Sequence, residues 1–316
     1  MRKIFLIFFI FISSLMADDS ILQSIIKNEI VPNIEKAING VQNVQKNQTK
    51  DSFENLVISW KKVETSYVIG ELNSDFLDTP RFIDVFNNLK EDLNSQMKRV
   101  LYSSNKEEEA LFKNSFKTIN ALEYVMFTDD KNIDEKRRKK IIFLISDSIL
   151  KHLKDIKEAY ENYLKNPTKT VLEENAILIN SLIASSYRLK EWRVGNAGGF
   201  SSKYKNDPKN SRAEYFLSQN SFLAINSILE AQKEILEAKK YKTLFTLAEE
   251  KNVTSDIKTV LDKINIAQND LKTLKKDDFS NSQKVFEAVS QIHDLYYSSI
   301  IEKLGLKPDI LDADGD

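Results

Sequence analysis

Residues 111–127 read LFKNSFKTINALEYVMF, and this stretch gives the first indication of the fold. Its apolar residues recur at intervals of 4, 3 and 7 positions, as on the buried face of an α-helix: Phe112, Phe116, Ile119 and Met126. Glu123 falls in the same stripe. The pattern therefore predicts one helix across the stretch, with a carboxylate on its apolar face.

That carboxylate needs an explanation, because burying a lone charge costs several kcal/mol. Glu123 must be paired with a cation, bound to a metal, protonated, or open to a cleft. Asn120 lies one turn earlier, beside it. The alternative is that the stripe rotates near its end and leaves Glu123 in water, because short apolar stripes drift around a helix.

The composition indicates an all-α protein. Only 7 glycines and 5 prolines accompany 41% hydrophobic residues, which favours long helices. Besides the central stretch, helices are predicted at residues 20–44 with an interruption at Pro32, 52–71 behind a Ser52 cap, 80–102, 134–165, 171–194, from Arg212 onward, 252–274 and 280–304.

The N-terminus has the features of a secretory signal peptide. Arg2 and Lys3 precede an apolar run at residues 4–12, and small residues follow up to Ala17, where cleavage is predicted. No later stretch approaches the 18 apolar residues of a membrane span. The chain has no cysteine, which excludes disulfides, thiolate metal sites and a lipid-anchored cysteine. These features predict a periplasmic protein that does not span the membrane.

Charge gives no sign of a polyanionic partner. The full chain carries a formal net charge of −1, and loss of the two basic signal residues leaves −3. Neither nucleic acid nor a membrane surface is predicted as a partner.

The chain length suits one large domain or two lobes with adequate cores. Because Pro167 cannot continue a helix, the predicted hinge separates an N-terminal helical bundle at residues 18–166 from a C-terminal one at 167–316. Glu123 and Glu214 are each followed by a tyrosine, and each is predicted at the edge of an apolar helical row. This echo suggests that the lobes arose by internal duplication, with a cleft between them.

A candidate site follows from this arrangement, in which acidic residues face arginines across the cleft and two tryptophans wall it. Its residues are Trp60, Glu64, Glu71, Asn120, Glu123, Arg188, Glu191, Trp192, Arg193, Glu214 and Ser218. Oxygen ligands suit hard cations such as Ca²⁺, Mn²⁺ or Fe³⁺, and a metal ion (iron, calcium or zinc) on Glu123 is one interpretation. The alternative is a network of ion pairs joining the lobes.

Support for an enzyme from the residues themselves is weak. There is no HExxH motif, no cysteine nucleophile and no phosphate-binding glycine loop. The two histidines, His152 and His293, lie far apart, and neither has the sequence context of a catalytic base.

Residues 250–254 read EKNVT, which is an N-glycosylation sequon. An acidic residue stands two positions before the asparagine, a form that some bacteria use. Most sequons stay unmodified.

Three segments carry a family resemblance: residues 59–64 (SWKKVE), 120–127 (NALEYVMF) and 188–195 (RLKEWRVG). In this order, and behind a signal peptide, they resemble the imelysin-like family over nearly the whole mature chain. The resemblance implies two helical-bundle lobes related by duplication and a site in the cleft between them. It also implies a periplasmic or outer-membrane setting and a connection with iron uptake.

Some imelysin-like proteins are described as metallopeptidases, and the metal-binding component of a ferrous-iron uptake system is related. The family's hallmark is Gly-x-His-x-x-Glu. Here Thr118 replaces the glycine and Asn120 the histidine, so only Glu123 matches. An amide is a poorer ligand than imidazole for a transition metal and cannot act as a base. The departure argues against both the usual metal site and peptidase activity.

The leading hypothesis is a non-catalytic imelysin-like protein that uses the cleft to bind a metal, a metal chelate, or a small or peptide ligand in iron uptake. Iron-uptake proteins of the envelope are the candidate partners. One alternative is a metallopeptidase with an altered ligand set. The other is a helical scaffold that binds another envelope protein.

Overall fold

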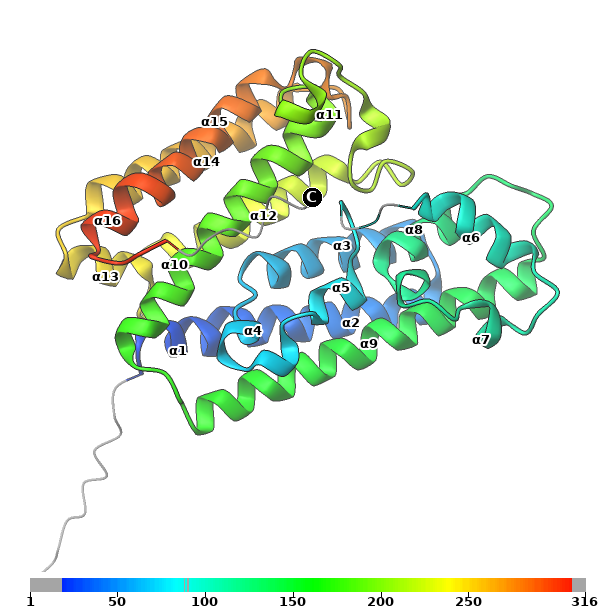
Figure 1. Cartoon of the computed structure of the whole chain (residues 1–316), viewed down its shortest axis with the longest axis horizontal. Coiled ribbons are helices and arrows are strands. Elements are labelled where there is room, and N and C mark those ends of the chain that lie inside the picture. Colours follow the sequence, from blue (N-terminus) through cyan, green and yellow to red (C-terminus); the bar gives the residue numbers. More distant parts are fainter. Residues whose placement is uncertain (1–18, 88, 90, 309–316) are drawn as a thin grey trace, which may run out of the picture.

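The computed structural model of the chain describes residues 19–87, 89 and 91–308 (Figure 1). These residues form an all-α fold, as the composition predicts, and contain no β-strand. The predicted signal peptide, residues 1–17, lies outside the described residues. No helix of the described part is long and apolar enough to cross a membrane.

The longer helices supply most of the core. They are α2 (Val31–Asn47), α3 (Lys50–Thr65), α6 (Leu93–Tyr102), α9 (Glu135–Lys165), α10 (Val171–Arg188), α12 (Ser221–Leu236), α14 (Thr254–Thr273) and α15 (Gln283–Asp294). Shorter helices complete the fold: α1 (Ile21–Ile25), α4 (Ile69–Leu72), α5 (Thr79–Ile83), α7 (Glu107–Ala110), α8 (Ile119–Phe127), α11 (Asn196–Gly198), α13 (Leu244–Glu250) and α16 (Ile301–Lys303).

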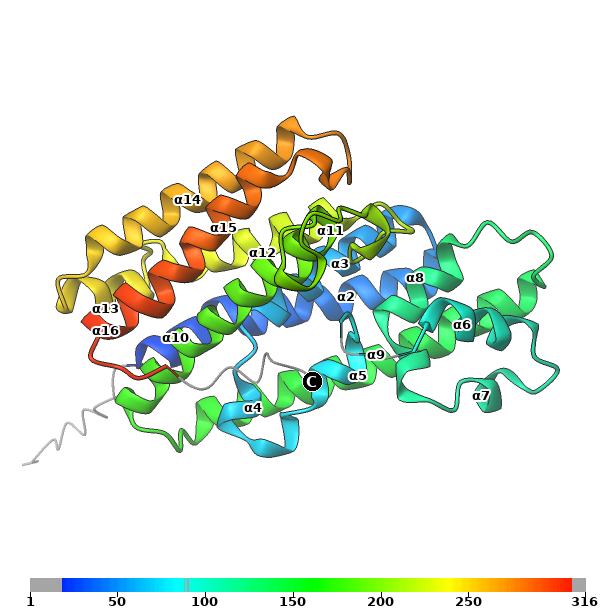
Figure 2. The same ribbon diagram turned by 45° about the horizontal axis from the view of Figure 1, so that its top comes forward.

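The long helices lie in two groups that meet along one interface (Figures 1 and 2). In the first group α2 packs against both α3 and α9, and in the second α14 packs against α15. Helix α12 of the second group packs against α3 of the first, and α10 contacts α1. The chain passes between the groups at residues 166–170, near the predicted hinge. Division into lobes at residue 166, and their duplication, stay predictions.

Capping residues explain where several helices begin. Thr49, rather than Ser52, caps α3: the Thr49 hydroxyl accepts from the Ser52 N–H, and the Ser52 hydroxyl accepts from the Thr49 N–H. Thr170 and Glu173 form the same reciprocal pair at the start of α10. Asp134 caps α9, which ends at Lys165 as predicted.

Pro32 does not interrupt the first helix. A π-helical turn at Ile26–Ile30 joins α1 directly to α2, and Pro32 stands in the first turn of α2. Proline has no N–H to donate and its ring crowds the preceding turn, and the wider π-helical turn directly before Pro32 accommodates it within the continuous helix.

The single helix predicted across residues 111–127 is wrong in its first half. Helix α8 begins only at Ile119, because the Thr118 hydroxyl accepts from the Ala121 N–H and caps it. Phe112 is 72% exposed and does not belong to a buried stripe. Glu123 is 7% exposed, so the alternative that leaves it in water is wrong.

Two other predicted helices contain irregular backbone. The predicted helix at residues 80–102 stops at Ile83, and α6 starts at Leu93. The segment from Arg212 to Asn220 is not an α-helix, because Tyr215 and Gln219 have left-handed φ values of 57° and 56°. Glu214 therefore lies in a turn, and its likeness to Glu123 is not a likeness between two helices.

Candidate functional site

A fully buried lysine lies at the interface of the two helix groups. Lys61, on α3, is 0% exposed, and its Nζ lies 2.7 Å from Glu64 Oε2, 2.7 Å from Asp84 Oδ2 and 2.5 Å from Glu214 Oε1. An ammonium has three donors, and here each meets a carboxylate. The position is set by the helix, since Phe53, Val57 and Lys61 follow one another at four-residue spacing on its buried face.

Arg193 completes this cluster from the opposite side. Its Nη2 lies 2.8 Å and 2.9 Å from the two Glu64 carboxylate oxygens, and its Nε lies 2.8 Å from Glu214 Oε2. Arg193 sits in the π-helical segment Leu189–Gly195 that continues α10. Glu64 and Glu214 thus each bridge the lysine and the arginine, which links α3 to the second helix group.

Asp84 is the third carboxylate of the cluster. Its Oδ2 accepts from the Trp60 indole N–H at 3.0 Å and from the Tyr215 hydroxyl at 3.0 Å, and its Oδ1 accepts from the Phe86 N–H at 2.9 Å. Burial opposes ionisation, but the Lys61 ammonium and these donors hold the pKa of Asp84 well below its usual range.

The three carboxylates of the cluster differ in the net direction of their pKa shifts. Although burial works against the charged form, Arg193 and Lys61 hold the pKa of Glu64 below its ordinary value. For Glu214, burial outweighs the same two cations and raises the pKa to about 7. A third cation, Arg188, stands near Glu64, and burial lowers its pKa. Arg188 has no hydrogen-bond partner among the described residues.

A cavity of about 200 Å³ opens beside this cluster. We call it the Glu123 pocket. Its walls come from the irregular segment after α5, from α8 and from the turn before α12, and its lining residues are Val85, Phe86, Asn87, Leu89, Glu91, Leu93, Asn94, Asn120, Glu123, Ser211, Ala213, Glu214, Tyr215, Phe216 and Leu217. The charged side chains among them are three glutamates, and none of the described lining residues is basic.

Glu123 is held at one oxygen only. Its Oε1 accepts from the Ser218 N–H at 2.8 Å and from the Ser218 hydroxyl at 2.7 Å, whereas Oε2 has no hydrogen-bond partner in the described part. Burial raises the pKa of Glu123 to about 7, although both Ser218 donors oppose the shift, and the Glu214 charge adds to it. The carboxyl is therefore near half-protonated at neutral pH.

Asn120, at the position of the family's histidine, accepts a hydrogen bond from the backbone of the protein. Its Oδ1 accepts from the Val85 N–H at 2.7 Å and so fixes the segment that follows α5. One of the two lone pairs of the oxygen that could ligate a metal is thus already engaged. Among the described residues, no group of three or more His, Cys, Asp or Glu side chains is placed to hold a metal ion. The donor set does not fit the metal site that the family resemblance implies.

The remaining predicted site residues do not line the pocket, and of them only Trp60 contacts the cluster, through its hydrogen bond to Asp84. Glu71 is exposed on α4, and Glu191 is half-buried and pairs with the neighbouring Lys190 at 3.4 Å. Trp60 is 0% exposed, so it forms part of the core rather than a cleft wall. Trp192 is half-buried and does not line the Glu123 pocket.

Three residues of the cluster were not among the predicted site residues: Lys61, Asp84 and Tyr215. For Lys61 a signal exists in the four-residue spacing from Phe53 through Val57. Asp84 follows a short helix and precedes irregular chain, so no periodicity marks it. Tyr215 is marked only by standing next to Glu214.

The two histidines lie apart from the pocket and from each other. His152 stacks on Phe82 with ring centroids 5.3 Å apart. His293 Nδ1 lies 3.1 Å from the Ser186 hydroxyl, and its ring stacks on Tyr297. Burial lowers the pKa of both imidazoles.

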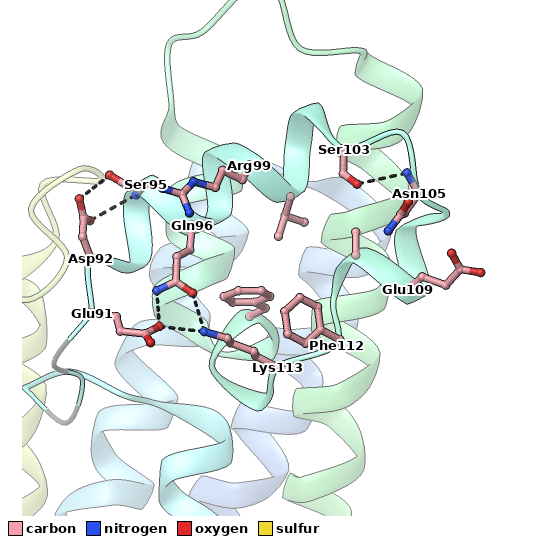
Figure 3. Close-up of a pocket in the computed structure, with 13 residues that line it drawn as sticks. Glu91, Asp92, Ser95, Gln96, Arg99, Ser103, Asn105, Glu109, Phe112 and Lys113 are labelled. Carbon is pink, nitrogen blue, oxygen red and sulfur yellow. Dashed lines mark hydrogen bonds and ion pairs between the residues drawn. The ribbon is translucent and has the colours of Figure 1, made fainter.

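A second cavity, of about 510 Å³, is lined by residues of α6 and α7 and of the segments beside them (Figure 3). These two helices lie at one end of the first helix group (Figure 1). Phe112 and Phe116 both line the cavity and meet edge to face with ring centroids 5.5 Å apart. On one wall the Lys113 Nζ lies 2.8 Å from Glu91 Oε2 and 3.0 Å from Gln96 Oε1 (Figure 3). Glu91 lines this cavity and the Glu123 pocket alike.

Comparison with known structures supports the fold. An imelysin-like protein from Psychrobacter arcticum 273-4 superposes with a TM-score of 0.72 at 14% identity, over 92% of this chain and 96% of the other. A putative iron-regulated protein A precursor from Parabacteroides distasonis ATCC 8503 gives 0.64 at 12% identity, over 89% and 95%. At these identities the likeness shows the fold alone.

No curated protein sequence matches the chain. The sequence profile of the imelysin family, in contrast, matches residues 23–299, which is most of the chain. This chain belongs to the imelysin family.

Proposed function

We propose that this imelysin-family protein is a non-catalytic binding protein of the bacterial envelope and that the Glu123 pocket is its binding site. The observation that carries the proposal is the Glu123 carboxyl, which lines the pocket without a cationic partner. Glu91 and Glu214 line the pocket too, but Lys113 pairs with Glu91, and Lys61 and Arg193 pair with Glu214. An unpaired carboxyl in a cavity without basic lining residues favours a positively charged ligand.

The chemical class of the ligand follows from the groups that line the pocket. Glu123 presents one carboxylate oxygen without a protein partner, and Phe86 and Phe216 supply aromatic surface, whereas the Tyr215 ring is buried beneath Lys61. Aromatic faces together with a carboxylate suit an organic ammonium or guanidinium group. A bare transition metal fits less well, because no group of three or more His, Cys, Asp or Glu side chains in the described part is placed to hold it. We therefore propose a small organic or peptidic cation, or a metal ion that brings its own ligands.

The volume limits the size of this ligand. A cavity of about 200 Å³ is smaller than a typical drug-binding pocket, so it accommodates one cationic headgroup rather than a whole peptide. The remainder of a longer ligand would lie outside, along the segment after α5.

Two further parts of the proposal concern the cellular setting. Export to the periplasm, with association to the outer membrane as a variant, rests on the signal-like N-terminus. A connection with iron uptake is suggested by the structural neighbour described as an iron-regulated protein A precursor. A binding protein for a cationic iron complex would unite these features.

The proposal is tested by calorimetric titration of the purified mature chain with a diamine and an arginine ester, and with ferrous iron as the bare metal that should bind less tightly. We expect the diamine or the arginine ester to bind, and Glu123→Gln to weaken that binding at least tenfold, because the substitution removes the charge and keeps the shape. Glu71→Gln is the matched control, since Glu71 is exposed on α4 and outside the pocket. Equal binding by parent and Glu123→Gln would refute the pocket assignment.

A further inference from the structure

The sequon at residues 250–254 lies at an exposed turn between two helices. Glu250 is the last residue of α13, and Thr254 is the first residue of α14. Asn252 stands between them with a left-handed φ of 59°, in the position where a helix commonly ends in a left-handed residue. Glu250 and Asn252 are both exposed.

The reactive groups of this sequon are not engaged by the protein. Neither the side-chain amide of Asn252 nor the hydroxyl of Thr254 has a hydrogen-bond partner among the described residues. The turn itself is held by the backbone: the Val253 N–H donates to the Ala248 carbonyl at 2.8 Å, and the Lys251 N–H to the Leu247 carbonyl at 3.1 Å. The fold thus presents the Asn252 amide to solvent without needing it.

A second sequon in the chain, Asn47-Gln48-Thr49, provides a contrast. The Asn47 amide donates to Asn43 Oδ1 at 2.9 Å, and the Thr49 hydroxyl caps α3 by accepting from the Ser52 N–H. Two positions before Asn47 stands Gln45 rather than an acid. Both of its reactive groups are therefore in use, and the acidic determinant is missing.

We propose that Asn252 is an N-glycosylation site for a bacterial oligosaccharyltransferase, of the type that requires an acidic residue two positions before the asparagine. The co-substrate is a polyprenyl-pyrophosphate-linked oligosaccharide. The Asn252 amide nitrogen forms a bond to the anomeric carbon of the first sugar, and the bond from that carbon to the pyrophosphate oxygen breaks. The amide loses one proton, and the polyprenyl pyrophosphate leaves.

The folded chain accommodates the product, because the exposed Asn252 side chain directs a glycan into solvent. Val253 is 1% exposed, so the turn must open locally when the segment enters the enzyme site. This opening breaks no side-chain hydrogen bond of Asn252 or Thr254, whereas opening the Asn47 sequon would remove the cap of α3. The inference rests on the proposed export, since the lipid-linked donor faces the periplasm.

The test is co-expression of the full chain, signal included, with such a transferase and its glycan pathway in a bacterial host. The periplasmic and cytoplasmic fractions are analysed by intact mass and by glycopeptide sequencing. We expect one added glycan, located at Asn252. Asn252→Gln and Thr254→Val should abolish it, Glu250→Gln should reduce its occupancy at least tenfold, and Asn47→Gln should leave it unchanged.

Unmodified protein in the periplasmic fraction refutes the modification and leaves export standing. Protein confined to the cytoplasm refutes export and the modification together. A glycan that survives in Thr254→Val, or that keeps its full occupancy in Glu250→Gln, also contradicts the proposal, because it would show that the sequon is not what is recognised. Circular dichroism of each variant confirms that loss of the glycan is not loss of the fold.

Discussion

Lys61 Nζ lies 2.5 Å from Glu214 Oε1, although the two residues are 153 positions apart in the chain. This contact joins α3 to the turn before α12, across the interface of the two helix groups. Both side chains are almost wholly buried, so each charge depends on the other. The charge cluster therefore connects the N-terminal and C-terminal halves of the chain. It lies beside the pocket, which Glu214 also lines.

Removing the lysine should destabilise the fold strongly. Lys61→Met leaves three buried carboxylates with one hydrogen-bonded cation, and we expect a loss of about 3–5 kcal/mol in the free energy of unfolding. Urea titration followed by circular dichroism measures it. Lys27→Met is the control, because the Lys27–Asp19 pair is largely exposed and should contribute less than about 1 kcal/mol. Similar losses in the two variants would contradict the role given to the cluster.

The raised pKa of Glu123 predicts a specific pH dependence. In the unfolded chain a glutamate ionises near pH 4.5, whereas Glu123 in the fold ionises near pH 7. A carboxyl with a raised pKa favours folding at low pH, and this contribution is lost as the pH rises from about 4.5 through 7. Glu123→Gln keeps an acceptor for Ser218 and does not titrate. The free energy of unfolding of the parent should therefore fall relative to that of Glu123→Gln by about 2–3 kcal/mol between pH 4 and pH 8.

Unfolding free energies of parent and Glu123→Gln across this pH range provide the measurement. A second variant, Ser218→Ala, tests the same pKa shift, because it removes the hydroxyl that lowers the pKa of Glu123. In that variant the loss of stability should extend to higher pH than in the parent. A constant difference between parent and Glu123→Gln from pH 4 to pH 8 would show that Glu123 ionises normally.

The fold class and the longest elements could be predicted from the sequence, because they depend on composition and on local signals. Asp134 caps α9, and Asn166-Pro167 follows its end, so both bounds could be recognised. The burial of Glu123 followed from its place among apolar residues. In each case the information lies within one or two turns of helix.

The rest of the site depends on irregular backbone, which has no periodicity to recognise. Asp84 reaches Lys61 because α5 ends at Ile83, and Glu214 reaches it because left-handed Tyr215 turns the chain. The π-helical segment around Arg193 shifts side chains around the helix axis relative to an α-helix. Contacts such as Arg193 with Glu64, 129 positions apart, arise only from packing of the whole chain.

Two glycines in left-handed conformation allow steric crowding to be separated from backbone strain. Gly199 has φ 75°, and a Cβ added there would lie 2.7 Å from the Pro208 nitrogen. Gly305 has φ 69° with no atom within 4 Å of an added Cβ. Gly305→Ala should cost about 1 kcal/mol from strain alone, and Gly199→Ala about 3 kcal/mol, because the loop must also move. Thermal unfolding of both variants measures the difference, and equal costs would show that the loop yields freely.

Restoring the histidine of the family pattern is the sharpest test of why this chain departs from it. Asn120→His places an imidazole one turn from Glu123, whose Oε2 has no protein partner, and so creates two adjacent ligands. We expect Zn²⁺ or Mn²⁺ to bind at least tenfold more tightly than to the parent in calorimetric titration. The loss of the Asn120 bond to the Val85 N–H should cost about 1 kcal/mol of stability.

The matched control is Asn94→His, because Asn94 lines the same pocket but comes from α6 rather than from the turn before Glu123. If metal affinity rises in Asn120→His and not in Asn94→His, position 120 alone separates this chain from a metal-binding relative. If Asn120→His binds no better than the parent, the pocket lacks further ligands. In that case the hydrogen bond between Asn120 and Val85 is not the reason that the pocket binds no metal. The acidic lining would then favour a cation that does not need direct coordination by protein ligands.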